Sequence, residues 1–429
     1  MKKIIALVVA VLMVFAMSAC SGGATKSAAA TTAAKTEAAA ATTAAATQAP
    51  ATTAPASTTQ ATTTSATTAS AGKTAVDYSQ FKASDGSQLM TDPIIKTAPA
   101  RPSDPESLAD DDAGKYYDME YMGAGVTEKD AKVPASPKDG IKGKHIIVIV
   151  HGDHAWTTAY ENGWKESAAD LGFTVDCWSP NWDQAQQDQL IDQAINAKPD
   201  AIALIPLSAD NATAQFRKIT EAGIPAFGTN TLATTDSLKY MEAWTGPDDW
   251  SQMRQLADAL GESLGGKGGI CYITHNVGTS PYYARTYGPI TEFKSKYPNI
   301  TTLDIQSPGF EAADCKQVVS DWITRFGDKL NAIFLADDSA QATGTVDAIK
   351  EAGRTDIKVV AAGNSKTGQD LVKSGDLLMI NQQSAEGDAG LCARTMSEWF
   401  AGNTVANVGY LSTTMITKDN VADFYPCQW

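Results

Sequence analysis

Two overlapping motifs in the chain contain residue types with which enzymes bind phosphate or attack a carbonyl group. Gly261–Gly268 comes within one residue of the phosphate-binding P-loop, and Gly261-Glu-Ser263-Leu-Gly265 inside it matches the G-x-S-x-G pattern of serine nucleophiles. Each motif needs a strand that leads through the loop into a helix, whereas this stretch ends a predicted helix and precedes a predicted strand. Gly268 also stands where the P-loop has the Ser or Thr that binds Mg²⁺. We therefore interpret the stretch as a helix end that glycines terminate.

A third motif, His151-Gly-Asp153-His154, directly follows a predicted buried strand and contains possible zinc ligands. Imidazole nitrogens and carboxylate oxygens both bind zinc. The histidine-rich sites of metallo-hydrolases need more imidazoles than the 4 histidines of this chain provide. One zinc ion on these three residues, and with it an extracellular hydrolase, remains an alternative. The favoured interpretation is a loop that lines a ligand site, and neither a metal ion nor another cofactor is expected.

The elements that would position such loops begin at Lys144, where the sequence pattern changes. Continuous apolar runs, each long enough for one buried strand, then alternate with amphipathic stretches of helical periodicity. The predicted strands are 145–150, 173–178, 201–206, 225–228, 269–274, 301–305, 332–336, 358–362 and 377–381. The predicted helices are 157–171, 183–197, 211–222, 250–264, 283–297, 311–326 and 340–352. This alternation is typical of parallel sheets covered by helices on both faces, so the sequence predicts an α/β protein with two doubly wound parallel-sheet lobes.

Polar and aromatic side chains follow the predicted strands of both lobes. Ligands of such sheets bind beyond the carboxyl ends of the strands, and two facing lobes would place those ends along one cleft. The candidates in these loops are His154, Trp156, Trp182, Asn230, Arg285, Phe310, Asp337 and Asn364. This mixture suits neutral polyhydroxylated ligands, because each hydroxyl both donates and accepts hydrogen bonds while C–H faces pack on aromatic rings.

Several of these loops carry motifs of a known family. The motifs are A-R-x-x-G at Ala284–Gly288, an Asp-Asp turn at Asp337-Asp338, a first-loop aromatic at Trp156, and Gln383 after the predicted strand 377–381. With the order of the elements, they make residues 144–402 resemble the type I periplasmic-binding-protein family, in particular the ribose-type sugar-binding components of ABC importers. The resemblance implies that Arg285 and Asp337 bind the ligand and that Trp156 stacks on it. It also places Phe310 at the second ring position and Gln383 at the family's glutamine.

Two departures from the family affect ligand identity. The Asp-Arg pair of ribose-type proteins appears here as Asn230-Thr231, and a further Asp of the family appears as Gly363-Asn364. We therefore predict no ribose specificity, and Trp182 with Asp183 could compensate. The alternatives are that Trp182 only packs at a helix entry and that Asp183 only caps that helix. For Arg285 the alternative is a salt bridge between the lobes.

The resemblance also implies a three-segment hinge, with crossings near 244–246, 382–384 and 408–410. The N-terminal lobe is then 144–245 with 385–408, and the C-terminal lobe is 246–384 with 409–429. Residues 76–143 are an N-terminal extension with weak periodicity, which we expect to pack loosely on the domain.

The N-terminus has the layout of a bacterial export signal. Lys2 and Lys3 precede the apolar run Ile4–Phe15 and the small residues before Cys20. Met17-Ser18-Ala19-Cys20 resembles the lipobox of bacterial lipoproteins, in which the Cys is lipidated. We predict a signal peptide over 1–19, a lipid on Cys20 and an Ala/Thr-rich disordered tether over 20–75. The alternative is a plain secretory peptide.

Net charge and cysteine count limit the kinds of partner and of metal site that the chain can have. The formal charge of −15 disfavours nucleic acid and anionic lipid surfaces. Five cysteines remain once Cys20 is lipidated, none in a CxxC spacing, so a metal cluster is not expected and a disulfide such as Cys392–Cys427 stays open.

These observations predict a monomeric, lipid-anchored solute-binding protein at the outer face of the bacterial cytoplasmic membrane. It would capture a small neutral sugar or polyol between its lobes, without chemistry on the ligand, and deliver it to an ABC transporter permease. A sensory receptor of the same fold, for an autoinducer or a chemotaxis ligand, is the first alternative. The extracellular hydrolase is the second.

Overall fold

The computed structural model of the chain describes residues 77, 80–82, 89, 98–124 and 128–429. The predicted signal peptide, Cys20 and the tether lie outside these residues. Within the described ranges, no helix combines the length and the apolar character needed to cross a membrane.

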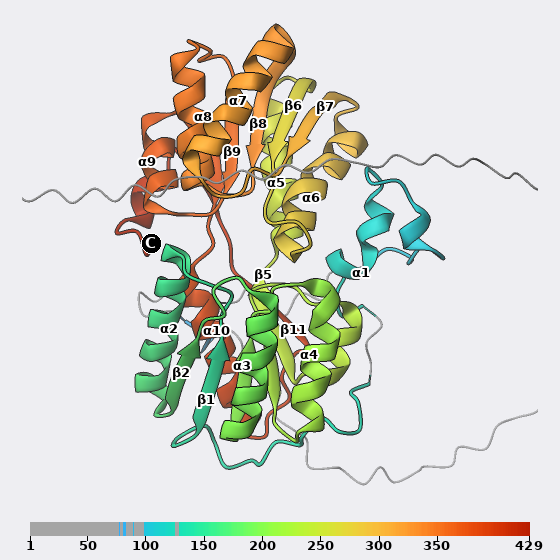
Figure 1. The fold of residues 1–429 in the computed structure, drawn as a ribbon, viewed down its shortest axis with the longest axis vertical. Helices are drawn as coiled ribbons and strands as arrows, with labels where there is room; N and C mark the ends of the chain where they lie inside the picture. The colour runs from blue at the N-terminus through green and yellow to red at the C-terminus, as the bar shows by residue number, and fades with distance from the viewer. Residues whose placement is uncertain (1–76, 78–79, 83–88, 90–97, 125–127) are drawn as a thin grey trace, which may run out of the picture. The chain divides into compact units, whose positions relative to one another are not determined.

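The first lobe contains a six-stranded sheet in the order β11-β5-β4-β3-β1-β2, and all its neighbouring strands run parallel. The strands are β1 (His145–Ile149), β2 (Thr174–Trp178), β3 (Ala201–Leu204), β4 (Ala226–Thr229), β5 (Ala243–Pro247) and β11 (Val408–Leu411). Successive side chains of a strand point to opposite faces. Ile147 of β1 therefore packs with α3 (Gln184–Ala197) and α4 (Ala209–Glu221), whereas Ile146 packs with α2 (Ala155–Leu171) and α10 (Ala385–Phe400). The helices α3 and α4 thus cover one face of the sheet, and α2 and α10 cover the other (Figure 1).

The second lobe repeats this plan with the strand order β12-β10-β9-β8-β6-β7. The strands are β6 (Lys267–Ile273), β7 (Asn299–Gln306), β8 (Leu330–Leu335), β9 (Lys358–Ala362), β10 (Met379–Asn381) and β12 (Met415–Thr417). They pair in parallel, except that β12 is antiparallel to β10. The helices α5 (Asp249–Ser263) and α6 (Ser280–Lys296) pack on one face, and α7 (Ala312–Phe326), α8 (Ala340–Glu351) and α9 (Lys366–Ser374) on the other. The predicted α/β class with two parallel-dominated sheets is confirmed.

The chain crosses between the two sheets three times, and the crossings correct the predicted boundaries. The predicted first crossing at 244–246 lies inside β5, so the chain leaves the first sheet only after Pro247. The second crossing joins β10 to α10 at 382–384. β11 pairs with β5 and β12 pairs with β10, so the third crossing is Ser412–Thr414 and not 408–410. Residues 409–411 thus belong to the first sheet and not to the second. The predicted boundary was wrong because two short apolar runs, 408–411 and 415–417, could each have completed the first sheet.

The described part of the extension contains η2 (Pro105–Ser107), η3 (Ala113–Tyr116) and the single helical turn α1 (Tyr117–Glu120). Tyr116 and Met122 are buried in the same hydrophobic cluster as the first sheet. The expectation of loose packing is therefore wrong for these residues. Their short 3-10 turns give no periodic sequence signal.

A close contact between α7 and α8 in the second lobe predicts a stability effect. A Cβ atom on Gly344 of α8 would lie 2.1 Å from the carbonyl oxygen of Ala312 in α7, whereas one on Gly288 of α6 would meet nothing closer than 3.4 Å. Gly344→Ala should lower the free energy of unfolding by about 2 kcal/mol, since α7 and α8 must move apart. Gly288→Ala should be neutral or gain up to about 1 kcal/mol from helix propensity. Urea unfolding of both variants checks this, and equal effects would contradict it.

Candidate functional site

A pocket of about 760 Å³, including space open to solvent, lies beyond the carboxyl ends of strands from both sheets. The first lobe contributes His151, His154, Trp156, Trp182, Pro206, Leu207, Asn230 and Thr231. The second lobe contributes His275, Thr279, Pro281, Arg285, Phe310, Asp337, Ala362 and Gly363, and Gln383 and Trp429 complete the lining. The pocket therefore depends on both lobes.

The structure brings eight of the nine predicted ligand residues into this one pocket. They are His154, Trp156, Trp182, Asn230, Arg285, Phe310, Asp337 and Gln383.

Asn364 is the predicted residue that does not line the pocket. It is buried, and its side-chain oxygen accepts a hydrogen bond from the backbone N–H of Gln383 at 3.0 Å. Its neighbour Gly363 lines the pocket in its place. Asn364 therefore fixes the second hinge crossing, and the prediction missed the lining position by one residue.

The first helix of the first lobe places two of the candidates. His154 is the N-cap of α2, and its Nδ1 accepts the backbone N–H of Trp156 at 3.1 Å. The ring of Trp156 stacks on Tyr160 one turn later, with centroids 5.0 Å apart. Trp156 thus presents to the pocket an aromatic ring that packs on Tyr160.

Trp182 lies at the edge of the pocket over His151. The two rings are 4.5 Å apart and inclined by 23°, and Trp182 is 39% exposed. Asn181 and Trp182 have φ values of +50° and +66°, a backbone region that bulky residues rarely occupy. This turn folds the indole back over His151. Asp183 accepts the N–H of Gln186 as the N-cap of α3, which is the capping role weighed for it in the sequence.

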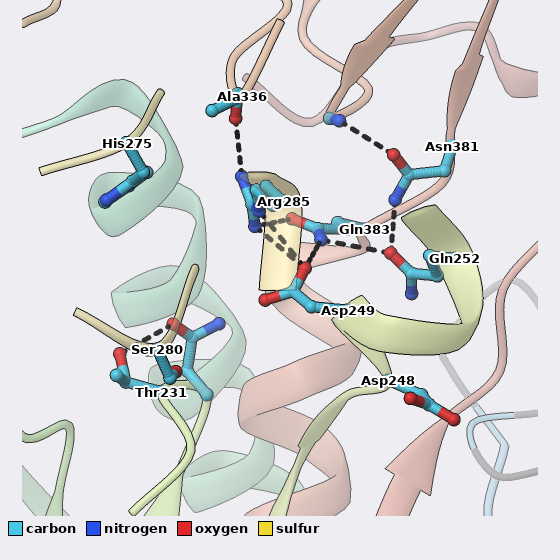
Figure 2. A network of polar contacts seen from close by, with 12 residues as sticks. Thr231, Asp248, Asp249, Gln252, His275, Ser280, Arg285, Ala336, Asn381 and Gln383 are labelled. Carbon is cyan, nitrogen blue, oxygen red and sulfur yellow. Dashed lines mark hydrogen bonds and ion pairs between the residues drawn. The ribbon is translucent and has the colours of Figure 1, made fainter. Parts of the chain in front are cut away.

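Arg285 of α6 forms the centre of a buried polar network (Figure 2). Its Nη1 donates to the carbonyl of Ala336 at 2.8 Å and its Nη2 donates to Oε1 of Gln383 at 2.9 Å. Its Nε and Nη2 lie 3.2 and 3.1 Å from Oδ1 of Asp249. Among the described residues the hydrogen bonds of Arg285 use three of the five N–H groups of a guanidinium, and they leave one N–H on Nη1 and one on Nη2, the latter beside Asp249. Arg285 pairs with Asp249 of its own lobe, so the alternative of an interlobe salt bridge is wrong.

The same network ties the pocket to the hinge. Asp249 begins α5 directly after the first crossing, and Gln383 lies in the second crossing. Nε2 of Gln383 donates to Asp249 at 2.7 Å and to Gln252 at 3.1 Å, and Asn381 donates to Gln252 (Figure 2). Burial raises the pKa of Asp249 and outweighs the opposing effect of Arg285. Moving the lobes must therefore disturb the residues that hold Arg285.

The three histidines of the pocket are neutral at physiological pH. Burial lowers the pKa of His151 to about 3, with His154 adding to the effect. Burial also lowers the pKa of His154, against the pull of Asp337, and lowers that of His275 well below the usual range. A neutral imidazole has one N–H donor and one nitrogen acceptor, which matches the two capacities of a hydroxyl group.

Backbone contacts fix which nitrogen of each ring carries the proton. Nδ1 of His151 accepts from the N–H of Gly152 at 3.0 Å, and Nδ1 of His154 accepts from Trp156, so both rings keep their proton on Nε2. Nδ1 of His275 faces the hydroxyl of Thr279 at 3.0 Å, and that hydroxyl donates to the carbonyl of Asn276. His275 is therefore the donor at Nδ1 and offers Nε2 as an acceptor. The three imidazoles thus have two N–H donors, on Nε2 of His151 and of His154, and one acceptor, Nε2 of His275.

The two neighbouring aspartates after β8 have different tasks. Oδ2 of Asp337 accepts the N–H of Ser339 at 2.9 Å at the start of α8, so this predicted ligand residue also satisfies a helix end. Asp338, which follows it, accepts the N–H of Ser365 at 2.9 Å. Burial and the nearby Asp337 raise the pKa of Asp338 well above the usual range. Asp338 thus fastens the β9–α9 loop.

Sequence reasoning did not select three aromatic or imidazole residues of the lining. His151 lies in the loop that is expected to line a ligand site but is not among the predicted ligand residues, and His275 has no motif. Trp429 lies edge-on to His154, with ring centroids 5.6 Å apart, and accepts the N–H of Lys366 at its carbonyl. Nothing local in the sequence could reveal a contact between positions so far apart.

The ring nitrogens of His151 and His154 that accept backbone N–H groups are not free for a metal. Within the described ranges, no three side chains of His, Cys, Asp or Glu are grouped so that they could hold a metal ion. The zinc interpretation of 151–154 has no support in this geometry.

A buried carboxyl group beside the pocket predicts a pH effect. Oδ2 of Asp388 in α10 accepts from Nδ2 of Asn230 at 2.8 Å, and burial raises the pKa of Asp388 from 3.8 to about 7. The folded state therefore holds a proton that the unfolded chain loses, so stability falls as pH rises from about 4 to 7. Asp388→Asn keeps the acceptor and removes the ionisation.

The stabilisation of Asp388→Asn over the parent should grow by about 2–3 kcal/mol between pH 5 and pH 8. Chemical unfolding of both proteins at the two pH values measures it. A difference that is the same at both would contradict the role of Asp388.

Comparisons with known proteins agree with this architecture. A curated xylitol-binding protein of Mycolicibacterium smegmatis is 27% identical over 300 residues, which are 70% of this chain and 84% of that protein. A D-apiose import binding protein of Actinobacillus succinogenes is 24% identical over 229 residues, which are 53% of this chain and 72% of that protein. The crystal structure of an ABC transporter solute-binding protein from Bacillus halodurans, with bound myo-inositol, superimposes with a TM-score of 0.62 and 19% identity, over 68% of this chain and all of that one.

The family model described as the periplasmic binding protein domain matches residues 146–404, more than half of the chain. That match includes every strand of the first sheet except β1's first residue and β11, and the second sheet up to β10. The chain belongs to the type I periplasmic-binding-protein family.

Proposed function

We propose that this protein captures a neutral monosaccharide or related polyol outside the cytoplasm and delivers it to an ABC importer by closure of its two lobes. The observation that carries the proposal is the pocket, in which neutral imidazoles, one largely paired arginine and aromatic rings from both lobes surround one cavity.

The charges of the pocket favour a ligand without negative charge. Arg285 is paired with Asp249, and Asp337 adds a further carboxylate to the lining. An anionic ligand such as a sugar phosphate would meet an excess of negative charge inside a cavity of low dielectric constant, which makes repulsion stronger than in water. Neutral hydroxyls instead find donors at His151 and His154 and an acceptor at His275.

The relatives support the same ligand class. The curated ones are named for xylitol and for D-apiose, and the solved structure holds myo-inositol. All three are uncharged compounds rich in hydroxyl groups.

The mechanism that we propose is reversible closure without chemistry on the ligand. The family is made of binding proteins. A ligand that contacts both lobes stabilises the closed state by its differential affinity for it. Trp429, which is held by Lys366 of the second lobe and lies against His154 of the first, places a wall of the pocket across the cleft.

The location of the protein follows in part from its family, which is extracytoplasmic. We further propose a lipid on Cys20, a signal peptide over 1–19 and a tether that allows the monomeric domain to reach the permease. The lipobox-like sequence at 17–20 supports this part of the proposal.

A thermal-shift screen tests the ligand class. Xylitol, myo-inositol, D-apiose, pentoses, hexoses and nucleosides are each added to the purified protein, with glucose 6-phosphate and glucuronate as anionic controls. A ligand that binds only the folded state at about 100 times its Kd stabilises it by about 2.7 kcal/mol. We expect at least one neutral compound, and neither anion, to raise Tm. Failure of every neutral sugar and polyol, or a shift only with the anions, would overturn the proposal.

The ring of Trp182 offers a sharper test because it is partly exposed and caps the pocket edge. Trp182→Ala should weaken binding of the best compound about tenfold, the value of one lost aromatic contact. Val277→Ala is the matched control, since Val277 is 67% exposed and is not part of the lining. Calorimetric titration of both variants gives the affinities. Equal affinities in the two variants would place the ligand away from Trp182.

A further inference from the structure

The N-terminal extension lies before the residues that the family model matches, so the family assigns it no role. Its described part nevertheless makes specific contacts with both lobes, and these contacts are strongest around the single turn α1.

The first lobe holds the extension on both sides of residues 125–127. The hydroxyl of Thr235 donates to the carbonyl of Asp118 in α1 at 2.8 Å. Further along, Nζ of Lys129 donates to the carbonyls of Leu238 and Met241 at 2.9 and 2.8 Å. These acceptors lie in or just after η4 (Thr235–Tyr240), which packs on α4 of the first lobe.

The second lobe holds the same turn through a buried ion pair. Both carboxylate oxygens of Glu120 accept from Arg254 of α5, at 2.9 and 2.7 Å, and Arg254 also donates to Glu292 of α6 at 2.9 Å. The side chains of Glu120 and Glu292 are 6% and 9% exposed. Desolvation raises the pKa of Glu292, but hydrogen bonds from Lys296 and Arg254 outweigh it and leave the pKa below its usual value. Desolvation lowers the pKa of Arg254, but its hydrogen bonds to Glu120 and Glu292 outweigh this and raise the pKa above its usual value. The guanidinium is therefore charged and lies against two buried carboxyl groups.

Aromatic packing supports this second contact. The ring of Tyr116 stacks on Tyr287 of α6 with centroids 4.9 Å apart and an inclination of 20°, and it lies 5.3 Å from Trp250 of α5. An ion pair between Asp111 and Lys294, 2.7 Å long, adds a further contact to α6.

Asp118 and Glu120 are two residues apart on one helical turn, so the backbone positions from which the two lobes are contacted are only about 3 Å apart along the helix axis. A hydrogen bond of 2.8 Å is lost when its atoms separate by about 1 Å. The lobes cannot move apart at this edge unless either the bond to Thr235 or the buried pair with Arg254 breaks. Separating that pair would leave a buried charge without its partner, which is costly.

We propose that residues 98–124 form a brace between the lobes that limits how far the ligand cleft opens. The brace needs no ligand, and its action is independent of which compound the pocket binds.

The test is the distance between the lobes in the full chain without added ligand. Spin labels are placed at the exposed positions Asn196 of α3 and Asp347 of α8, in a background in which Cys20, Cys177 and Cys427 are replaced by Ser. Double electron–electron resonance then gives the distribution of interlobe distances.

The variant Tyr116→Ala/Glu120→Gln releases the second-lobe side of the brace, and Thr235→Val removes the hydroxyl on the first-lobe side with little change in volume. Both should shift the distribution to longer distances. Lys132→Ala is the control, since it removes an exposed ion pair with Glu221 that joins the extension to the first lobe alone. It should leave the parent distribution unchanged.

Parent-like distances in both release variants, or in whichever of them folds, would overturn the brace, as would an equal shift in Lys132→Ala. Cooperative thermal unfolding shows which variants are folded. If the double variant does not fold, Thr235→Val and its control decide the question.

Discussion

The arrangement depends on a buried guanidinium held in place by a carboxylate and an amide. Polar atoms of Arg285, Asp249 and Gln383 lie within 2.7 to 3.2 Å of one another. Gln383 belongs to the second crossing between the lobes, and Asp249 directly follows the first. Removing one member of such a buried pair leaves an uncompensated charge and costs about 3–5 kcal/mol. The network therefore fixes the position of a ligand-facing arginine and the geometry of the hinge at the same time.

The pairing of Arg285 with Asp249 determines the polarity of the pocket. With its charge largely neutralised by Asp249, Arg285 acts mainly as an oriented hydrogen-bond donor. The neighbouring imidazoles are kept neutral by burial, and backbone contacts choose their donor and acceptor nitrogens. A site built in this way recognises hydroxyl groups by direction and is poorly suited to an anion. The walls come from different lobes, so a ligand that fills the pocket contacts both lobes.

The fold class and eight of the nine predicted pocket residues follow from the sequence. The reason is that parallel sheets bring the carboxyl ends of their strands together whatever the loops contain. Loop detail was less accessible. The strand β5 was not predicted, because it ends in Gly246-Pro247 and a Pro within an apolar run argues against a strand. Gly363 lines the pocket where Asn364 was predicted to do so, because the turn after β9, with φ +122° at Gly363, has no periodic sequence signal. The edge contact of Trp429 with His154 and the packing of Tyr116 in the extension depend on residues far apart in the chain.

The most direct measurement of the central claim is a crystal structure of the protein with the neutral compound that stabilises it most. The account predicts that compound between Trp156 and Phe310, with its hydroxyls within hydrogen-bond distance of Arg285 and of at least one of the three pocket histidines. The lobes should be closed over it. A ligand bound outside this pocket, or a pocket that holds an anion in contact with Arg285, would contradict the account.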